Sequence, residues 1–114
     1  MDSILTSIKK MLGIPENYTH FDTDIIIHIN SVLSVLNQLG VGPSDGFIIT
    51  DKNDNWSDFL PSGNKLELVK TYVYAKVRLI FDPPQSSSVS EALKNIINEF
   101  EWRINITVDI DPEE

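Results

Sequence analysis

The sequence predicts an all-α protein: one small four-helix domain spanning residues 1–114, with a long loop between the second and third helices and an extended C-terminal tail. Three observations support this. Four segments repeat apolar residues at helical spacing, glycine or proline separates them, and residues 41–63 show no helical period. One domain is expected at 114 residues, and a hydrophobic fraction of 41% is enough to bury a core.

The first two predicted helices cover residues 2–13 and 22–40. Apolar residues recur three, four and seven positions apart in both, which is typical of a helix with one buried face. Gly13 followed by Pro15 ends the first helix, because glycine accepts the left-handed cap and proline cannot continue the hydrogen-bond ladder. Asp22 is the expected N-cap of the second helix.

The third and fourth predicted helices cover residues 64–82 and 88–104. Asn64 and Glu67 stand at the spacing of a capping box, and the apolar arc that follows is wide, as in a central helix with more than one neighbour. Two consecutive prolines then stop the helix. The two helices should therefore form a helical hairpin across a short proline turn.

Residues 41–63 form a long loop that includes a candidate short strand at 47–50 and a candidate helical turn at 55–60. Loops of this length in compact domains are usually functional or disordered, and the aromatic residues here argue against disorder. Trp56 and Phe59 fit core packing and an interface equally well. We predict a binding or assembly loop whose contacts are made by Phe47, Trp56, Asp58, Phe59 and Leu60.

The expected tail, residues 105–114, begins with a change of period. Apolar and polar residues alternate from Ile104 onward, which is typical of a half-buried strand, although a frayed helix end is the alternative. A strand has no partner inside a four-helix domain, so we predict that Ile106, Val108 and Ile110 add to a sheet of another protein.

Charge and composition exclude several classes of function. With 9 basic and 17 acidic residues, the formal charge of −8 repels phosphate backbones and argues against general nucleic-acid binding. There is no cysteine for thiol catalysis, thiolate metal sites or disulfides. The first ten residues lack the order of a secretory signal, and no apolar run approaches the ~20 residues that span a bilayer. We expect a soluble, intracellular protein.

The sequence predicts no catalytic residue, cofactor or metal. His20 and His28 are the only histidines; Asp24, four residues before His28, is the one candidate partner of that side chain, but a general base also needs a positioned substrate, and a surface histidine is expected. No serine elbow or phosphate-binding glycine loop occurs. Residues 51–62 resemble a calcium loop at their first, third and fifth positions, but Trp56 replaces the glycine of the sharp turn and Ser62 the bidentate glutamate. A solvated turn is expected there.

Four segments carry a resemblance to a known family. They read GFIITD at 46–51, WSDFL at 56–60, LVKTYVYAKVRLIFDPP at 68–84 and EFEWRI at 99–104. In these segments and in the order of its predicted helices, the chain resembles the head–tail connector proteins (head-completion or adaptor proteins) of long-tailed bacteriophages and prophages. The 68–84 segment is the most specific part of the likeness.

The resemblance implies a non-enzymatic virion protein at the head–tail interface, present in the host cytoplasm during assembly. Members of this family form a ring, dodecameric in the family, beneath the portal, which extends the DNA channel and supports the next neck or tail-completion protein. DNA would pass through without sequence-specific binding, helped by an acidic lining.

The resemblance and the residues together define three expected interfaces. Lys76, Arg78 and Trp102 are expected to make lateral contacts between subunits, although Trp102 also fits packing at the rim of the core. The loop around Trp56 would meet the adjacent subunit or the next neck protein, and the tail would bind the portal. The alternative function is a small acidic helical regulatory module that sequesters a protein partner, which would form a one-to-one complex instead of a ring.

Overall fold

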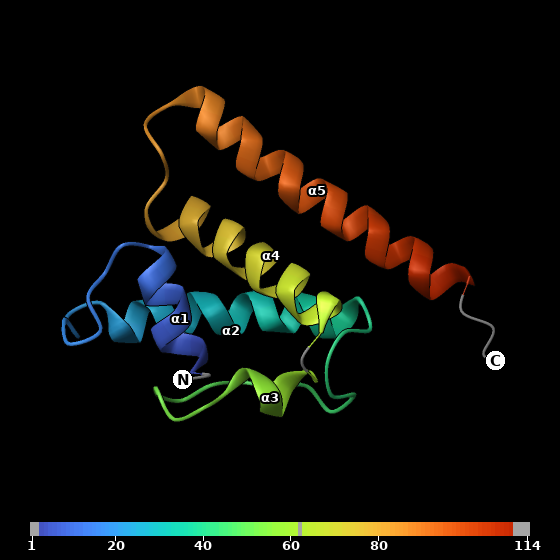
Figure 1. Ribbon diagram of the computed structural model, residues 1–114, viewed down its shortest axis with the longest axis horizontal. Helices are drawn as coiled ribbons and strands as arrows, with labels where there is room; N and C mark the ends of the chain where they lie inside the picture. The colour runs from blue at the N-terminus through green and yellow to red at the C-terminus, as the bar shows by residue number, and fades with distance from the viewer. Residues whose placement is uncertain (1–2, 62, 111–114) are drawn as a thin grey trace.

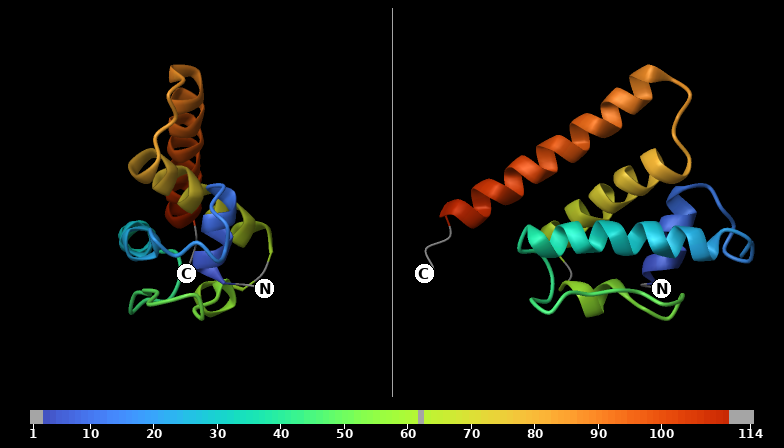
Figure 2. Two further views of the ribbon diagram at one scale, coloured as in Figure 1. Left: turned by 90° about the vertical axis from the view of Figure 1, so that its left-hand side faces the viewer. Right: turned by 180° about the vertical axis from the view of Figure 1, so that it is seen from behind.

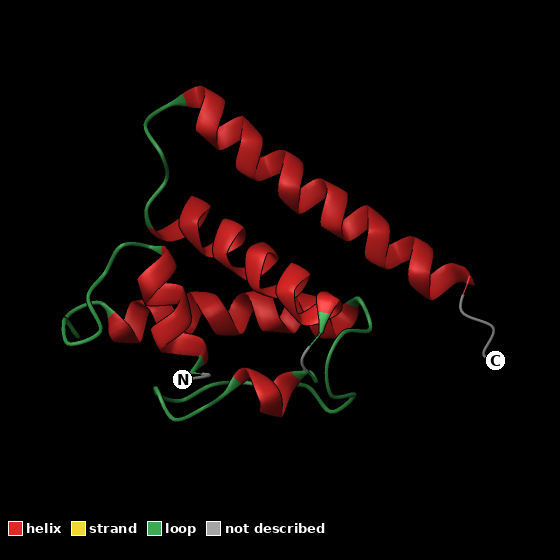
Figure 3. Ribbon diagram, viewed as in Figure 1, coloured by secondary structure: helices red, strands yellow, loops and turns green. Residues whose placement is uncertain are grey.

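The computed structural model describes residues 3–61 and 63–110, and within these residues it is helical with no strand (Figures 1 and 3). The helices are α1 (Ile4–Met11), α2 (Asp22–Gln38), α3 (Trp56–Phe59), α4 (Asn64–Phe81) and α5 (Ser87–Ile110). This confirms the predicted all-α fold. The four long helices match the four predicted segments, and α3 is the single turn expected within the long loop.

The helices surround one central pair. α2 packs against α4, and α1 packs across both of them. The loop that carries α3 runs beneath α1 and α2, as the edge-on view in Figure 2 shows. α5 lies on the other side of α4, which is the only helix against which it packs extensively. The molecule is therefore a compact body of α1 to α4 with one long helix attached to its surface (Figure 1).

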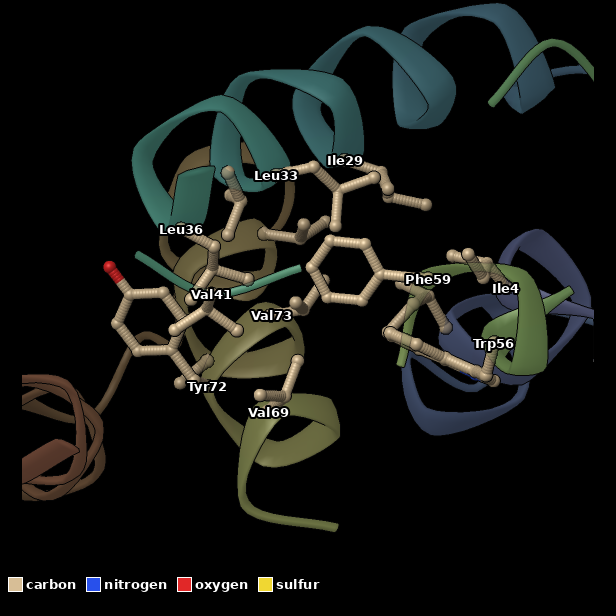
Figure 4. Close-up of a cluster of buried hydrophobic side chains, with 14 of the residues drawn as sticks. Ile4, Ile29, Leu33, Leu36, Val41, Trp56, Phe59, Val69, Tyr72 and Val73 are labelled. Atoms are coloured by element: carbon tan, nitrogen blue, oxygen red, sulfur yellow. The ribbon is translucent and has the colours of Figure 1, made fainter. Parts of the chain in front are cut away.

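The hydrophobic core lies between α1, α2, α4 and the long loop (Figure 4). Its largest fully buried side chains are Trp56 and Tyr72. α2 contributes an apolar stripe at helical spacing, and α4 contributes a wide buried arc, as the sequence predicted. From residues 87–103 of α5, whose side chains the structure describes, Leu93, Ile97 and Phe100 join the core.

Two predicted helix caps are wrong. The N-cap of α2 is Phe21, and Asp22 is the first helical residue; its carboxylate pairs with Lys9 (Nζ to Oδ1 2.8 Å) and makes no capping hydrogen bond. The N-cap of α4 is Gly63, whose φ of 144° suits glycine, and Asn64 makes no capping hydrogen bond. Glu67 therefore takes no part in a capping box.

The prediction of an extended tail is wrong for residues 105–110, which continue α5 to Ile110. A helix satisfies its own N–H and C=O groups, whereas a lone strand would leave them without partners. The rest of the expected tail, residues 111–114, lies outside the described residues. The candidate strand at 47–50 is also absent, because the Asn30 side chain takes the place of a partner strand at Ile49.

Candidate assembly surfaces

The aromatic residues of the long loop belong to the core of their own subunit. Trp56 is fully buried, and its Nε1 donates a hydrogen bond to Ser7 Oγ at 3.1 Å. Phe59 is 4% exposed and contacts the Phe47 ring, with 5.5 Å between the ring centroids. Figure 4 shows Trp56 and Phe59 directed into the core. The expectation that these two residues form an interface is therefore corrected: they are core residues.

Side-chain and backbone hydrogen bonds fix the loop against the helices. The Asn30 amide donates to Ile49 O at 3.0 Å and accepts from Ile49 N at 2.8 Å, as the backbone of a neighbouring strand would. The backbone N–H of Ile4 donates to Asp54 O at 3.0 Å, which ties α1 to the loop. Outside α3, hydrogen bonds of this kind hold the described part of the loop in place of regular secondary structure.

The segment that resembles a calcium loop uses its carboxylates to stabilise its own turn. Asp54 Oδ2 accepts hydrogen bonds from Thr50 N at 2.7 Å and Asp51 N at 3.3 Å. The bond from Thr50 N is the main reason why the pKa of Asp54 lies below its usual value of 3.8. Asp51 Oδ1 accepts from Asn53 N at 2.8 Å. Both side chains therefore act as acceptors within a tight turn.

The other predicted loop contacts differ in exposure. Asp58 is exposed, Phe47 and Leu60 are half-buried against the core, and Ile48, which the prediction omitted, is 66% exposed. Phe47 and Ile48 also line an open hollow of about 450 Å³ beside Ser34 and Asn37. Of the residues discussed here, Asp58 and Ile48 are the two that the loop exposes to a partner.

The two predicted lateral cations have partners within their own subunit. Lys76 Nζ lies 3.8 Å from Glu101 Oε2 and 5.7 Å from the centroid of the Tyr72 ring. Arg78 donates from Nε to Asp82 O at 2.7 Å and from Nη1 to Tyr74 Oη at 3.0 Å. Both side chains thus contribute to the internal packing and ending of α4.

A cluster of contacts around Tyr72 holds α5 against α4. The rings of Tyr72 and Phe100 stack with 4.4 Å between centroids, and Tyr72 Oη donates to Glu101 Oε2 at 2.8 Å. Burial raises the pKa of the Tyr72 hydroxyl, and the hydrogen bond and negative charge of Glu101 raise it further. The phenol therefore stays protonated and keeps donating to Glu101.

The remaining surface of α5 is exposed and partly apolar. Trp102, the third predicted lateral residue, is 64% exposed, so it is not a core residue. Leu68 of α4 and Ile96 of α5 are exposed as well, and together with Phe100 they line a shallow groove of about 200 Å³ between the two helices. α5 therefore offers apolar surface on more than one side.

The sequence reasoning missed a buried lysine. Lys9 is 2% exposed, and its ammonium group lies 2.8 Å from Asp22 Oδ1 and donates to Glu16 O at 3.0 Å. It follows Leu5 by four residues, so it falls on the apolar side of α1. A basic residue on the apolar side of one helix and an acidic residue at the start of the next could have indicated this buried ion pair.

These features are typical of a small helical structural subunit. Its buried polar groups stabilise its own fold, and its exposed apolar residues are available for contacts with other proteins. The family model for the phage connector protein matches residues 4–111, nearly the whole chain. The chain therefore belongs to the phage connector family, which confirms the resemblance noted above.

Family membership gives the chain a structural connecting role in a phage particle, with other head or tail proteins as partners. No curated protein and no solved structure matches the chain. Within the described residues, no helix combines the length and apolar character needed to cross a membrane.

Proposed function

We propose that this protein forms a ring of identical subunits beneath the portal, extends the DNA channel and connects the phage head to the next neck or tail protein. Membership of the phage connector family supports the connecting role. The observation that supports assembly is the packing of α5. Among residues 87–103, the part of this helix whose side chains the structure describes, three residues lie in the core and Trp102 is exposed. Surface of this kind is typical of protein interfaces.

The C-terminal end of α5 is the proposed portal-binding element. It reaches beyond the other helices along the long axis of the molecule (Figures 1 and 2). Because residues 105–110 are helical, the contact made by Ile106, Val108 and Ile110 would follow the helix-in-groove mode instead of strand addition. The backbone N–H groups of the segment are then already bonded within the helix before the portal is bound.

The acidic composition fits a DNA channel. A formal charge of −8 per subunit, repeated around a ring, repels the phosphate backbone and allows DNA to pass without adhering. In this proposal acidic residues line the channel, DNA makes no sequence-specific contact, and the protein has no catalytic role.

The decisive experiment is to mix the full chain with the portal protein of the same phage and to image the product by electron microscopy. The proposal expects a ring of subunits stacked on the portal around an open channel lined by acidic residues. A strict one-to-one complex without a ring would contradict it and would favour the regulatory module instead.

A truncation tests the portal-binding element. Ending the chain after Ile104 should abolish portal binding, while the melting temperature should change little because every core residue among the described side chains precedes Ile104. The matched control ends the chain after Ile110 and should bind normally. Equal portal binding by the two truncated proteins would refute the assignment.

A further inference from the structure

An aromatic cluster occupies one end of the molecule, where α2 begins and α4 ends. It contains both histidines of the chain and continues through Tyr18, Phe21 and Phe81. Phe21 meets Phe81 edge to face at 5.3 Å and His20 at 4.8 Å between ring centroids. Tyr18 is 47% exposed and Phe21 36%, so the cluster is open to a partner.

The cluster borders an open hollow of about 360 Å³. Its lining consists of the apolar residues Leu12, Ile14, Phe21 and Phe81 together with Asp82. The Asp82 carboxylate is the one charged group in the lining; its side chain is 61% exposed, and its Oδ2 lies 3.8 Å from Arg78 Nε of the same subunit. The hollow thus combines apolar walls with a carboxylate that can accept a further hydrogen bond. A group that fits it should be large and flat, with one N–H or O–H donor.

The chain itself carries such a group at its other end. Trp102 follows Leu93 by nine residues, about two and a half helical turns, so it lies opposite the side of α5 that packs on α4. The positions beside it on that side, Glu91, Asn95 and Asn98, are exposed and polar. A buried indole needs an acceptor for its N–H, which the Asp82 carboxylate can provide.

We propose that the Trp102 side chain of one subunit inserts into the hollow between Phe21 and Phe81 of the next subunit, with its indole N–H donating to Asp82. The inference rests on the proposed ring and names its lateral contact. The molecule is 46 Å long, and the C-terminal half of α5 lies at the opposite end from the junction of α2 and α4 (Figure 1). Two complementary patches at opposite ends give a head-to-tail contact, which is the kind that closes rings.

The contact also suits the charge of the subunit. Copies that each carry a charge of −8 repel one another, and a neutral indole in an apolar hollow adds no further charge to the interface. One tryptophan is too small an area for a stable pair, because specific interfaces bury about 1,200–2,000 Å². Trp102 is therefore the anchor of a weak contact that ring closure and portal docking reinforce. Added salt should strengthen it by screening the repulsion.

Crosslinking tests the contact in the full chain, which has no natural cysteine. Asn98→Cys and Gln85→Cys place exposed thiols beside Trp102 and beside Asp82 without altering either residue. A short bismaleimide should join a mixture of the two single variants into heterodimers and should join the double variant into a ladder of dimers, trimers and larger species. Lys65→Cys in place of Gln85→Cys is the exposed control and should give no ladder.

Trp102→Ala in the double variant should reduce the ladder at least about tenfold, as expected for loss of an interface anchor. Asn95→Ala, on the same exposed side of α5, should leave it unchanged. A ladder that survives Trp102→Ala would overturn the inference, and so would a product that stops at dimers, which indicates a two-fold pair.

Imaging with the portal separates the two proposals. Rings that form on the portal equally well with Trp102→Ala would refute the tryptophan contact and leave the ring intact. If the unaltered chain forms no ring on the portal, the proposed function fails together with this inference.

Discussion

The long loop and α5 differ in a way that reverses the usual expectation about loops and helices. The loop has almost no regular structure, yet it buries Trp56 and Phe59 and is tied to α1 and α2 by hydrogen bonds. α5 is the longest helix, yet it packs extensively on α4 alone. Regularity of the backbone and contribution to the core are therefore separate properties. In this protein the loop stabilises the subunit, and in the proposed function α5 would provide the surface for assembly.

The largest effect is expected at Trp56, the most deeply buried side chain of the loop. Trp56→Ala should lower the free energy of unfolding by about 3–5 kcal/mol, because it leaves a large cavity in the core and removes the hydrogen bond to Ser7. Urea denaturation followed by circular dichroism measures this loss. Ile48→Ala, at a 66% exposed position of the same loop, is the control and should change stability little. A loss as small as that of the control would mean that the loop does not stabilise the core.

A smaller effect is expected at Asn30, whose amide replaces a partner strand for the loop. Asn30→Ala leaves the N–H and C=O of Ile49 without these partners and should cost about 2 kcal/mol in unfolding free energy. Chemical denaturation gives the value, and hydrogen exchange of the Ile49 amide should accelerate. Unchanged exchange at Ile49 would show that the amide contact is dispensable.

The turn of the loop should respond weakly to acid. The lowered pKa of Asp54 means that its contribution to stability is fully present above the unfolded value of 3.8 and is lost as the pH falls through the folded pKa. Because Asp54 is only partly buried and lies in a surface turn, solvent screening keeps this contribution below about 1 kcal/mol. Denaturation of the unaltered chain and of Asp54→Asn should differ at neutral pH and converge near pH 2. A difference that persists at that pH would assign the effect to something other than ionisation.

The smallest effect on stability is expected on α5. Trp102→Ala should change the free energy of unfolding by no more than about 0.5 kcal/mol, because the side chain is 64% exposed in the isolated subunit. Thermal and urea denaturation check this value. A loss comparable to that of Trp56→Ala would remove the distinction between the two regions.

The sequence was sufficient for the helices and their hairpin because apolar periodicity and the paired prolines are local signals. It failed at the C-terminus because the residues that alternate there are also four apart, Ile104 with Val108 and Ile106 with Ile110, so the strand and helix patterns coincide. A chain without a partner strand resolves that ambiguity in favour of the helix.

The role of the loop aromatics could not be predicted from the sequence because their contacts connect distant positions. The indole of Trp56 meets a hydroxyl 49 residues earlier, and the backbone of Ile49 meets an amide 19 residues earlier. An aromatic loop that packs into the core of its own subunit and one that binds another protein can have the same composition, so composition does not distinguish them. The burial of Lys9 was missed for a related reason: it depends on a contact with Asp22, and the sequence pattern predicts Asp22 to be a helix cap.

The single-sided attachment of α5 has a further consequence for how the subunit opens. Only α4 holds it extensively, through the Tyr72–Phe100 stack and three core residues, and the turn that joins it to α4 contains two prolines. Detaching it leaves α1, α2, α4 and the loop in place, so its amides should exchange through a low-energy opening that the rest of the chain does not share. If α5 opens in this way, it would act as an arm that adjusts its angle to a neighbour while the body of α1, α2, α4 and the loop stays folded.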